Sequence, residues 1–181
     1  MTFEEKTLES EMIYRGKIIN LRRDKVTVLH GTSYREIVEH HGGSVIAALK
    51  DNGNVIAVKQ YRKPAGRVML EIPAGKRDPG ESPDETARRE LKEETGYTAE
   101  KLILLTRMYP SPGYTEEVLY IYLALGLTPG ETDPDYNEAI DVCEYPLDTL
   151  LEMADRGEIE DAKTLAGLLL AKRYLDHNAV K

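Results

Sequence analysis

Three glutamates of this sequence, Glu90, Glu93 and Glu94, share one face of a predicted helix because they stand at positions i, i+3 and i+4. Like charges at this spacing repel one another and weaken a helix unless something offsets them. A hard divalent cation would do so, since carboxylate oxygens are the ligands that Mg²⁺ prefers. The chemistry indicated is metal binding, and the alternative interpretation is an ordinary solvated acidic face.

The helix that carries these glutamates has well-marked ends. Ser82 is placed as an N-cap, Pro83 as the first helical residue, and Glu85 completes a capping box. Gly96 occupies the position at which a C′ glycine terminates a helix. The helix follows the strand-like run LEIPAG, which ends in a Pro/Gly loop. The sequence therefore predicts a strand, a loop and a helix, with the carboxylates on the helix.

The same stretch resembles the Nudix box, the signature of the Nudix hydrolases. Gly75 is followed after five residues by Glu81 and, after seven more, by the run RELKEETGY. The apolar positions of the signature hold Leu91 and Tyr97. Its seven fixed positions are filled by Gly75, Glu81, Arg89, Glu90, Glu93, Glu94 and Gly96. The resemblance implies hydrolysis of a nucleoside diphosphate linked to some other moiety.

Segments outside the box resemble one subfamily, the ADP-ribose pyrophosphatases. Pro112 lies fifteen residues after Tyr97, and the runs VKQYRKP, LEIPAGK and DAKT (161–164) match the same enzymes. The resemblance implies Mg²⁺-dependent hydrolysis of ADP-ribose to AMP and ribose 5-phosphate, with Mn²⁺ as a substitute metal. Two alternatives stay open. One is a diphosphatase for another nucleotide sugar, such as GDP-mannose; the other, disfavoured because every box glutamate is present, is a non-catalytic nucleotide sensor.

The resemblance also implies roles for single residues. The implied metal ligands are the carbonyl of Ala74 and the carboxylates of Glu81, Glu90, Glu93 and Glu94. Glu93 is also expected to take part in catalysis by bridging a second ion, and Arg89 is expected to pair with a neighbouring carboxylate. The general base of the subfamily is a glutamate on a loop after the box. In GETDPDYNEAIDV the best-placed residue is Glu138, with Glu131 and Asp135 as alternatives.

Four residues are expected to bind the substrate. Arg62 is the expected phosphate-binding cation because a guanidinium suits bidentate phosphate contacts; the alternative is a solvated arginine at a strand end. The resemblance implies that Glu71 hydrogen-bonds a ribose and that Pro112 and Gly113 line the substrate site. With no Trp and a single Phe, the sequence leaves a tyrosine as the group on which adenine stacks, without indicating which.

Composition excludes several classes of protein. At 181 residues with 41% hydrophobic and 31% charged residues, the chain has the make-up of an ordinary globular domain. A net charge of −8 without a basic stripe argues against nucleic-acid binding. No apolar run approaches the length of a membrane span, and the acidic start is unlike a signal peptide. Cys143, the one cysteine, is expected to be a small buried residue in a cytoplasmic protein.

Many β-type runs with three helical segments predict a mixed α/β fold. The Nudix resemblance implies an α/β/α sandwich around a mixed central sheet, preceded by a small N-terminal antiparallel sheet. We therefore expect an N-terminal β-region over residues 1–40 and a Nudix domain over residues 41–181. The N-terminal runs carry a large apolar load for a small sheet, and similar enzymes are homodimers that exchange this sheet. We expect a homodimer whose N-terminal sheet contributes to the partner's substrate pocket.

Overall fold

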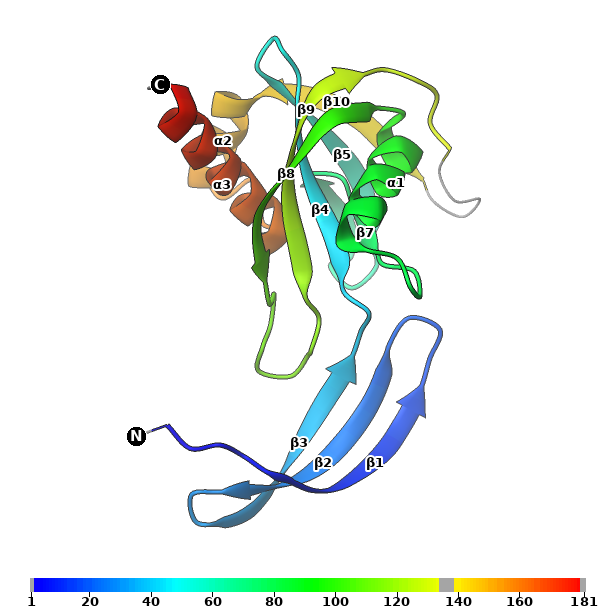
Figure 1. Cartoon of the computed structure of the whole chain (residues 1–181), viewed down its shortest axis with the longest axis vertical. Coiled ribbons are helices and arrows are strands. Elements are labelled where there is room, and N and C mark those ends of the chain that lie inside the picture. Colours follow the sequence, from blue (N-terminus) through cyan, green and yellow to red (C-terminus); the bar gives the residue numbers. More distant parts are fainter. Residues whose placement is uncertain (1, 134–138, 180–181) are drawn as a thin grey trace. The chain divides into compact units, whose positions relative to one another are not determined.

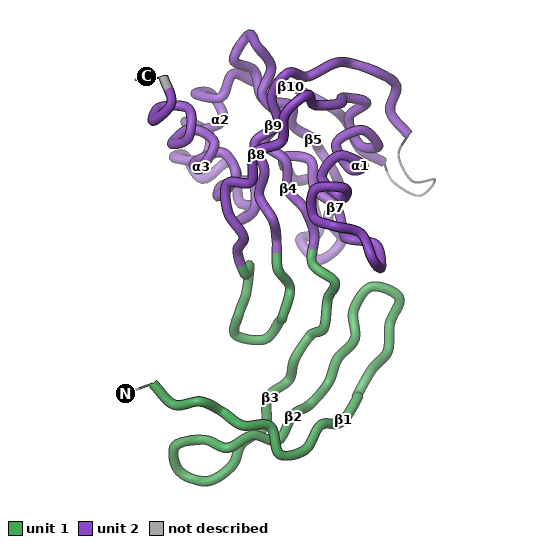
Figure 2. Tube along the Cα trace, viewed as in Figure 1, with its two compact units in different colours: residues 1–42, 109–118 green, residues 43–108, 119–181 purple. Residues whose placement is uncertain are grey.

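The chain forms two compact units, shown in different colours in Figure 2. The computed structural model describes residues 2–133 and 139–179. Unit 1 comprises residues 1–42 and 109–118, and unit 2 comprises residues 43–108 and 119–181. The short segment 109–118 thus belongs to unit 1, although in the sequence it connects two strands of unit 2.

Unit 1 is a three-stranded antiparallel sheet in the order β1-β2-β3. Its strands are β1 (Thr7–Arg15), β2 (Asn20–Val28) and β3 (Gly31–Glu39). The segment 109–118 is attached to β3, because the Val38 N–H donates to the Tyr114 carbonyl at 2.8 Å and the Glu116 N–H donates to the Val38 carbonyl at 3.1 Å. The predicted small N-terminal antiparallel sheet is confirmed.

Unit 2 is built on a seven-stranded mixed sheet with the central order β10-β5-β4-β9-β8, to which β6 adds beside β5 and β7 beside β4. The β4–β9 pair is parallel and the other pairs are antiparallel. The strands are β4 (Gly43–Leu49), β5 (Asn54–Arg62), β6 (Arg67–Glu71), β7 (Ala74–Lys76), β8 (Thr98–Met108), β9 (Leu119–Thr128) and β10 (Ile140–Pro146).

Helices cover both faces of this sheet, with α1 on one side and α2 and α3 on the other (Figure 1). Their bounds are Pro83–Thr95 for α1, Leu147–Asp155 for α2 and Ala162–Ala179 for α3. Between α1 and the sheet, Ala87 and Leu91 pack on Ile46 and Tyr122; the larger core on the opposite face is closed by the two C-terminal helices. The predicted α/β/α sandwich with a mixed central sheet is confirmed.

The centre of the sheet follows from the sequence pattern. Strand β4 is buried along six of its seven residues, from Gly43 to Ala48, as expected for a continuous apolar run with helices on both sides. Its neighbour β9 places Leu119, Ile121 and Leu123 toward the α3 side and alternates with Tyr122 and Ala124 toward α1. This period of two distributes one strand between the two cores.

The ends of α1 match their sequence prediction. The Ser82 N–H donates to the Glu85 carboxylate at 2.8 Å, and the Glu85 N–H donates to the Ser82 hydroxyl at 3.3 Å, which together form the capping box. Gly96 terminates the helix in the left-handed conformation at φ 76°, where its N–H donates to the Lys92 carbonyl. The helix that carries the box glutamates is therefore fixed at both ends by local chemistry.

The three helices α1, α2 and α3 match the three helical segments predicted from the sequence. Strand β9 begins at Leu119, after the 109–118 segment. The preceding residues leave the sheet because Glu116 bonds to β3 of unit 1 instead. None of the helices within residues 2–133 and 139–179 combines the length and apolarity needed to span a membrane.

Candidate active site

The box glycine lies against a box glutamate at the junction of β7 and α1. A Cβ atom on Gly75 would lie 1.8 Å from Cδ of Glu90 and 1.9 Å from its Oε1. While Glu90 keeps this position, no L side chain fits at residue 75, so glycine is what allows the close approach of the carboxylate. The strand β7 and the helix α1 are thereby brought together at the point where the carboxylates gather.

Arg89 binds three of the box carboxylates at once. Its Nε and Nη2 donate to the two oxygens of Glu81 at 2.9 Å, and its Nη1 donates to Glu90 at 2.8 Å and to Glu93 at 2.9 Å. The remaining Nη2–H donates to the Lys76 carbonyl at 3.0 Å. All five N–H donors of this guanidinium are therefore engaged, which makes Arg89 a structural hub and confirms its predicted pairing with a carboxylate.

These contacts set the charge state of Glu81. Hydrogen bonds from Arg89, with further donors from the Asp78 N–H and the Thr86 hydroxyl, lower the pKa of Glu81 to about 2 against a burial effect that raises it. The Glu81 side chain is 15% exposed, and that of Glu93 is 37% exposed. Glu93 is thus the box carboxylate in this cluster that faces solvent most.

Glu94 lies on the sheet side of the helix and is only 6% exposed. Its Oε2 accepts the N–H of Ala74 at 3.1 Å. This bond places the Glu94 carboxylate next to the backbone of Ala74. The carboxylate of Glu90 fills the space beside the following residue, Gly75. The residues expected to act together as metal ligands thus surround one short segment, the start of β7.

The donor set suits a hard divalent cation. Glu81, Glu90, Glu93 and Glu94 supply four negative charges, of which Arg89 offsets one. Within residues 2–133 and 139–179, no three His, Cys, Asp or Glu side chains are grouped as a finished metal site. The geometry gives the reason, because three of these carboxylates each direct an oxygen to Arg89 rather than to a common point. The ligand chemistry, four carboxylates with oxygen donors, fits a hard divalent cation.

Arg62 is the last residue of β5, and its side chain binds Glu71, the last residue of the neighbouring antiparallel strand β6. The Arg62 Nε and Nη2 donate to the two Glu71 oxygens at 2.7 Å each, and Lys163 of α3 also donates to Glu71. Burial would raise the pKa of Glu71, but the bonds from Arg62 and the charge of Lys163 outweigh it, so that the pKa lies below its ordinary value. The lysine partner was not foreseen from the sequence, although the run DAKT that contains it was singled out.

The other expected site residues lie elsewhere or outside the described residues. Pro112 and Gly113 are exposed on the 109–118 segment of unit 1. Glu131 is exposed. The remaining base candidates, Asp135 and Glu138, lie outside the described residues.

The loop that leads toward these base candidates is tied to α1. The Asp133 N–H donates to the Glu93 carbonyl at 3.0 Å, and Gly130 packs against Gly96 so closely that a Cβ on Gly96 would lie 2.6 Å from the Gly130 carbonyl oxygen. The loop after β9 therefore runs along the C-terminal end of the helix that carries the box glutamates.

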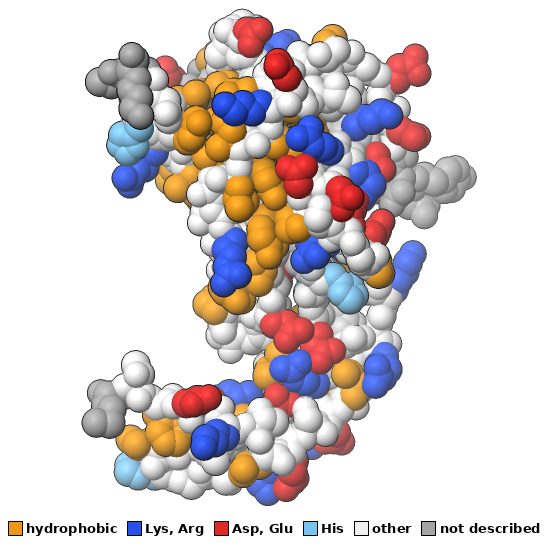
Figure 3. Space-filling model, viewed as in Figure 1, with side chains coloured by type: hydrophobic (Ala, Val, Ile, Leu, Met, Phe, Trp, Pro, Cys, Tyr) orange, Lys and Arg blue, Asp and Glu red, His pale blue; other side chains and the backbone are white. Residues whose placement is uncertain are grey.

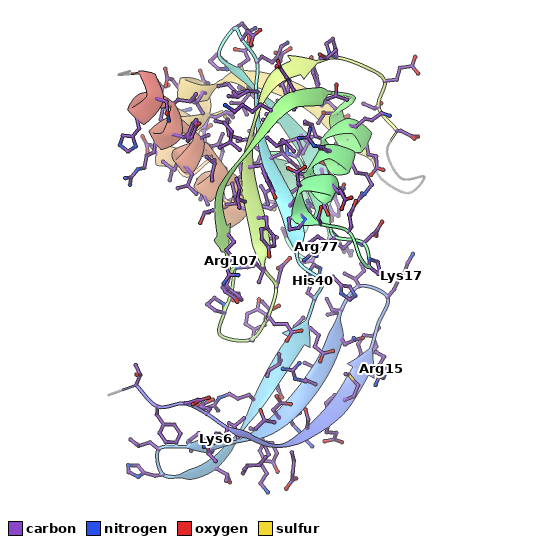
Figure 4. All side chains as sticks on the ribbon, in the orientation of Figure 1. Lys6, Arg15, Lys17, His40, Arg77 and Arg107 are labelled. Carbon is purple, nitrogen blue, oxygen red and sulfur yellow. The ribbon has the colours of Figure 1, made fainter. Side chains whose placement is uncertain are left out.

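Two arginines flank Tyr120 on the α1 side of the sheet. Arg107 of β8 is the direct cross-strand partner of Tyr120, and the Arg77 guanidinium carbon lies 6.0 Å from the centre of the tyrosine ring (Figure 4). Arg77 also donates two bonds to the Glu81 carbonyl, at 2.8 and 3.2 Å. On the face shown in Figure 3, hydrophobic side chains form a band over β8 and β9. Leu104 of β8 is 53% exposed. The group of Arg77, Arg107 and Tyr120 was not predicted from the sequence.

Unit 1 has a polar hollow of about 270 Å³, lined among others by Lys17, Glu39, His40 and His41. The His40 Nδ1 accepts the Gly42 N–H at 3.0 Å, so this imidazole is engaged in the turn that follows β3. The lone cysteine is equally inert, because burial raises the pKa of the Cys143 thiol and so disfavours the reactive thiolate. Neither feature has the character of a catalytic centre.

Comparison with known proteins agrees with this architecture. The curated relatives include ADP-ribose pyrophosphatases of Bacillus subtilis, 44% identical over 90% of both chains, and of Mycobacterium tuberculosis, 40% identical over 90% of this chain and 81% of the other. A methanol dehydrogenase activator of Bacillus methanolicus is 40% identical over 96% of this chain and 93% of its own. Each of the three matches nearly the whole chain.

A crystal structure of an ADP compounds hydrolase has the same fold, with a TM-score of 0.86 at 23% identity over 98% of this chain and 97% of the other. The model of the nucleoside diphosphate sugar hydrolase N-terminal domain matches residues 5–32. The model of the NUDIX domain matches residues 40–168, which include the carboxylates, their arginine and the box glycine. The chain therefore belongs to the Nudix family.

Proposed function

We propose that this chain hydrolyses the diphosphate bond of ADP-ribose, giving AMP and ribose 5-phosphate, with Mg²⁺ as the metal and Mn²⁺ as a substitute. The observation that carries the proposal is the cluster of four box carboxylates around the start of β7. The substrate is supported by two relatives at 40% and 44% identity that are ADP-ribose pyrophosphatases.

The residues that would hold the metal are the Ala74 carbonyl and the carboxylates of Glu81, Glu90, Glu93 and Glu94. A divalent cation supplies two things there: it offsets negative charge on the phosphate oxygens and lowers the pKa of bound water. Glu93 is the most exposed carboxylate bound to Arg89, which suits it to act at the substrate side of the cluster. Glu81, held by Arg89, serves to keep the group in place.

Glu138 is the proposed general base, which takes a proton from the water that attacks phosphorus as the diphosphate P–O bond breaks. The proposal rests on the family resemblance and on the tie between Asp133 and Glu93, from which the loop continues. Glu131 and Asp135 remain the alternatives.

Arg62 is the proposed phosphate-binding cation, and Glu71 orients it and bonds a ribose hydroxyl. Arg62 suits this task because its side chain is 37% exposed while its guanidinium is held in one plane by Glu71. Pro112 and Gly113, on the 109–118 segment of unit 1, are proposed as substrate-binding residues on the family resemblance. A loop of this kind offers backbone groups without a bulky side chain at Gly113, where a Cβ would meet open space.

A panel of substrates tests this function. The purified chain is assayed with ADP-ribose, GDP-mannose, ADP-glucose, NADH and a nucleoside triphosphate in the presence of Mg²⁺, and products are identified by chromatography. We expect the highest kcat/KM for ADP-ribose. A clear preference for GDP-mannose would favour the alternative nucleotide-sugar diphosphatase. Tight binding of a nucleotide without any turnover would favour a sensor.

We also propose a cytoplasmic homodimer in which the N-terminal region, residues 1–40, crosses to the partner's Nudix domain, residues 41–181. The support is apolar exposure within residues 1–40. The exposed large apolar residues of this region are Phe3, Leu8, Ile13, Tyr14, Ile18, Ile19, Leu29 and Tyr34. Surfaces of this kind favour association. Light scattering at micromolar concentration tests the dimer, and a monomer there would refute it.

A further inference from the structure

Glu71 is a buried carboxylate bonded to two cations of unit 2, Arg62 on the neighbouring strand and Lys163 on α3. It is 1% exposed, and it receives bonds from Arg62, nine residues before it, and from Lys163, 92 residues after it. A carboxylate in such a position is costly unless its oxygens are fully bonded. The arrangement therefore requires that both cations remain in place.

The first turn of α3 is built to hold Lys163. Asp161 caps the helix, because its Oδ2 accepts the Thr164 N–H at 3.0 Å and the Thr164 hydroxyl at 2.6 Å. The Thr164 hydroxyl in turn accepts the N–H of Ile72, next to Glu71, at 3.0 Å. The Lys163 ammonium also lies 2.9 Å from Asp161, and the side chain is 16% exposed. Two side chains, Lys163 and Thr164, thus attach the start of α3 to the residues at the end of β6, and Asp161 bonds to both.

The contacts run from Lys163 through Glu71 to Arg62, and the Arg62 side chain is the most exposed of the three. Glu71 is bonded to the Arg62 Nε and to one Nη2 proton, and the other three of the five N–H donors of Arg62 have no partner among the described residues. Bidentate pairing fixes the plane of the guanidinium and hence the directions of those donors. Among the charges that raise the pKa of Arg62, after the bond from Glu71, is that of Glu94, which places this arginine on the carboxylate side of unit 2.

We propose that Lys163 is a positioning residue for substrate binding: by sharing the buried carboxylate of Glu71, it fixes the plane in which Arg62 presents its remaining donors to the diphosphate. This inference rests on the proposed function. Without the lysine, Oε2 of Glu71 loses one of its two charged donors and keeps only the bond from Arg62. The buried carboxylate is then no longer tied to α3, so Glu71 and Arg62 can shift together, and the plane of the guanidinium is no longer fixed.

The test compares Lys163→Met with Lys172→Met. Lys172 is on the same helix and pairs with Asp176 at the surface, so its loss controls for removal of a helix lysine. Loss of the fixed direction of Arg62 weakens its charged hydrogen bonds to the diphosphate, so the KM for ADP-ribose should rise by about tenfold or more. We expect kcat to change by less than about threefold, because a contact made equally in ground and transition states affects KM alone. Lys172→Met should leave both unchanged.

A double-mutant cycle separates positioning from a merely structural role. In an Arg62→Ala background, Lys163→Met should raise KM no further, because the lysine acts through the arginine. An equal rise in KM in both backgrounds, or a loss of thermal stability with KM unchanged, would overturn the proposal. Lys163→Gln, which keeps an N–H donor but removes the charge, repeats the cycle where the Met variant does not fold. A wild-type chain that does not hydrolyse ADP-ribose would refute the proposed function instead.

Discussion

Gly75→Ala is the sharpest perturbation of the carboxylate cluster, because it adds one methyl group to the residue that Glu90 touches. Gly75 lies in β7 and is absent from the residues with positive φ, so alanine suits its backbone. The added Cβ would lie 1.8 Å from Cδ of Glu90. The cost of the substitution therefore falls on the position of one carboxylate.

The size of the effect follows from this distance. An ordinary contact is about 3.4 Å, so the Glu90 carboxylate must withdraw by about 1.6 Å. Misplacement of a reacting group by about 1 Å costs on the order of 10²-fold in rate. We expect kcat for ADP-ribose to fall at least about 10²-fold, equivalent to about 2.7 kcal/mol of transition-state stabilisation. Stability should change by less than about 1 kcal/mol, because the glutamate side chain can rotate.

The assay is steady-state hydrolysis of ADP-ribose at saturating Mg²⁺, with thermal unfolding measured in parallel. Gly53→Ala is the control, because Gly53 has φ +84° in the β4–β5 turn and a Cβ there meets nothing within 4 Å. Alanine in that conformation costs roughly 1–2 kcal/mol, so the control should lose stability and keep its activity. A Gly75→Ala enzyme with kcat within threefold of the wild type would refute the assigned role of this contact.

Three further predictions concern the same cluster. Glu94→Gln should keep the fold and lose several kcal/mol of transition-state stabilisation, about 10²-fold or more in kcat, and an unchanged rate at low millimolar Mg²⁺ would contradict the metal site. Glu138→Gln should lower kcat by roughly 10²–10⁴-fold with little change in metal affinity; a larger effect of Glu131→Gln would move the base to that residue. Because Arg89 lowers the pKa of Glu81 to about 2, the stability from this pair is complete above the ordinary value of 4.5 and is lost as pH falls toward 2. Urea unfolding at pH 5 and pH 3 should show this loss, and it should be smaller in Glu81→Gln.

Features set by local chemistry were predictable from the sequence. The capping box at Ser82 and Glu85 and the terminating Gly96 need only neighbours within one turn, and the structure has all three as expected. The central place of β4 followed from its unbroken apolar run. The motif predicted a glycine at position 75 but not the reason for it. The reason, a Glu90 carboxylate that fills the space beside Gly75, is known only from the structure.

Contacts between distant segments were not predictable in this way. Lys163 and Glu71 are separated by 92 residues, and neither residue carries a periodic signal that pairs them. Glu116 and Val38 are likewise separated by 78 positions, and nothing in the sequence pattern pairs them. In both cases a tertiary hydrogen bond decided the outcome, whereas the sequence pattern reports only on neighbours along the chain.

The two arginines of the site differ in what their pairing leaves for substrate. All five N–H donors of Arg89 are bonded to the box carboxylates and the Lys76 carbonyl. Arg89 therefore has no donor left for a substrate, and its role is to hold the carboxylates together. Arg62 uses two donors for Glu71, and within residues 2–133 and 139–179 its other three have no partner. In a chain of net charge −8, a cation that both keeps free donors and is held in one plane is the group best suited to receive a diphosphate. The buried Glu71 and its lysine are what give Arg62 that property, and this is why we assign recognition to Arg62 and support to Arg89.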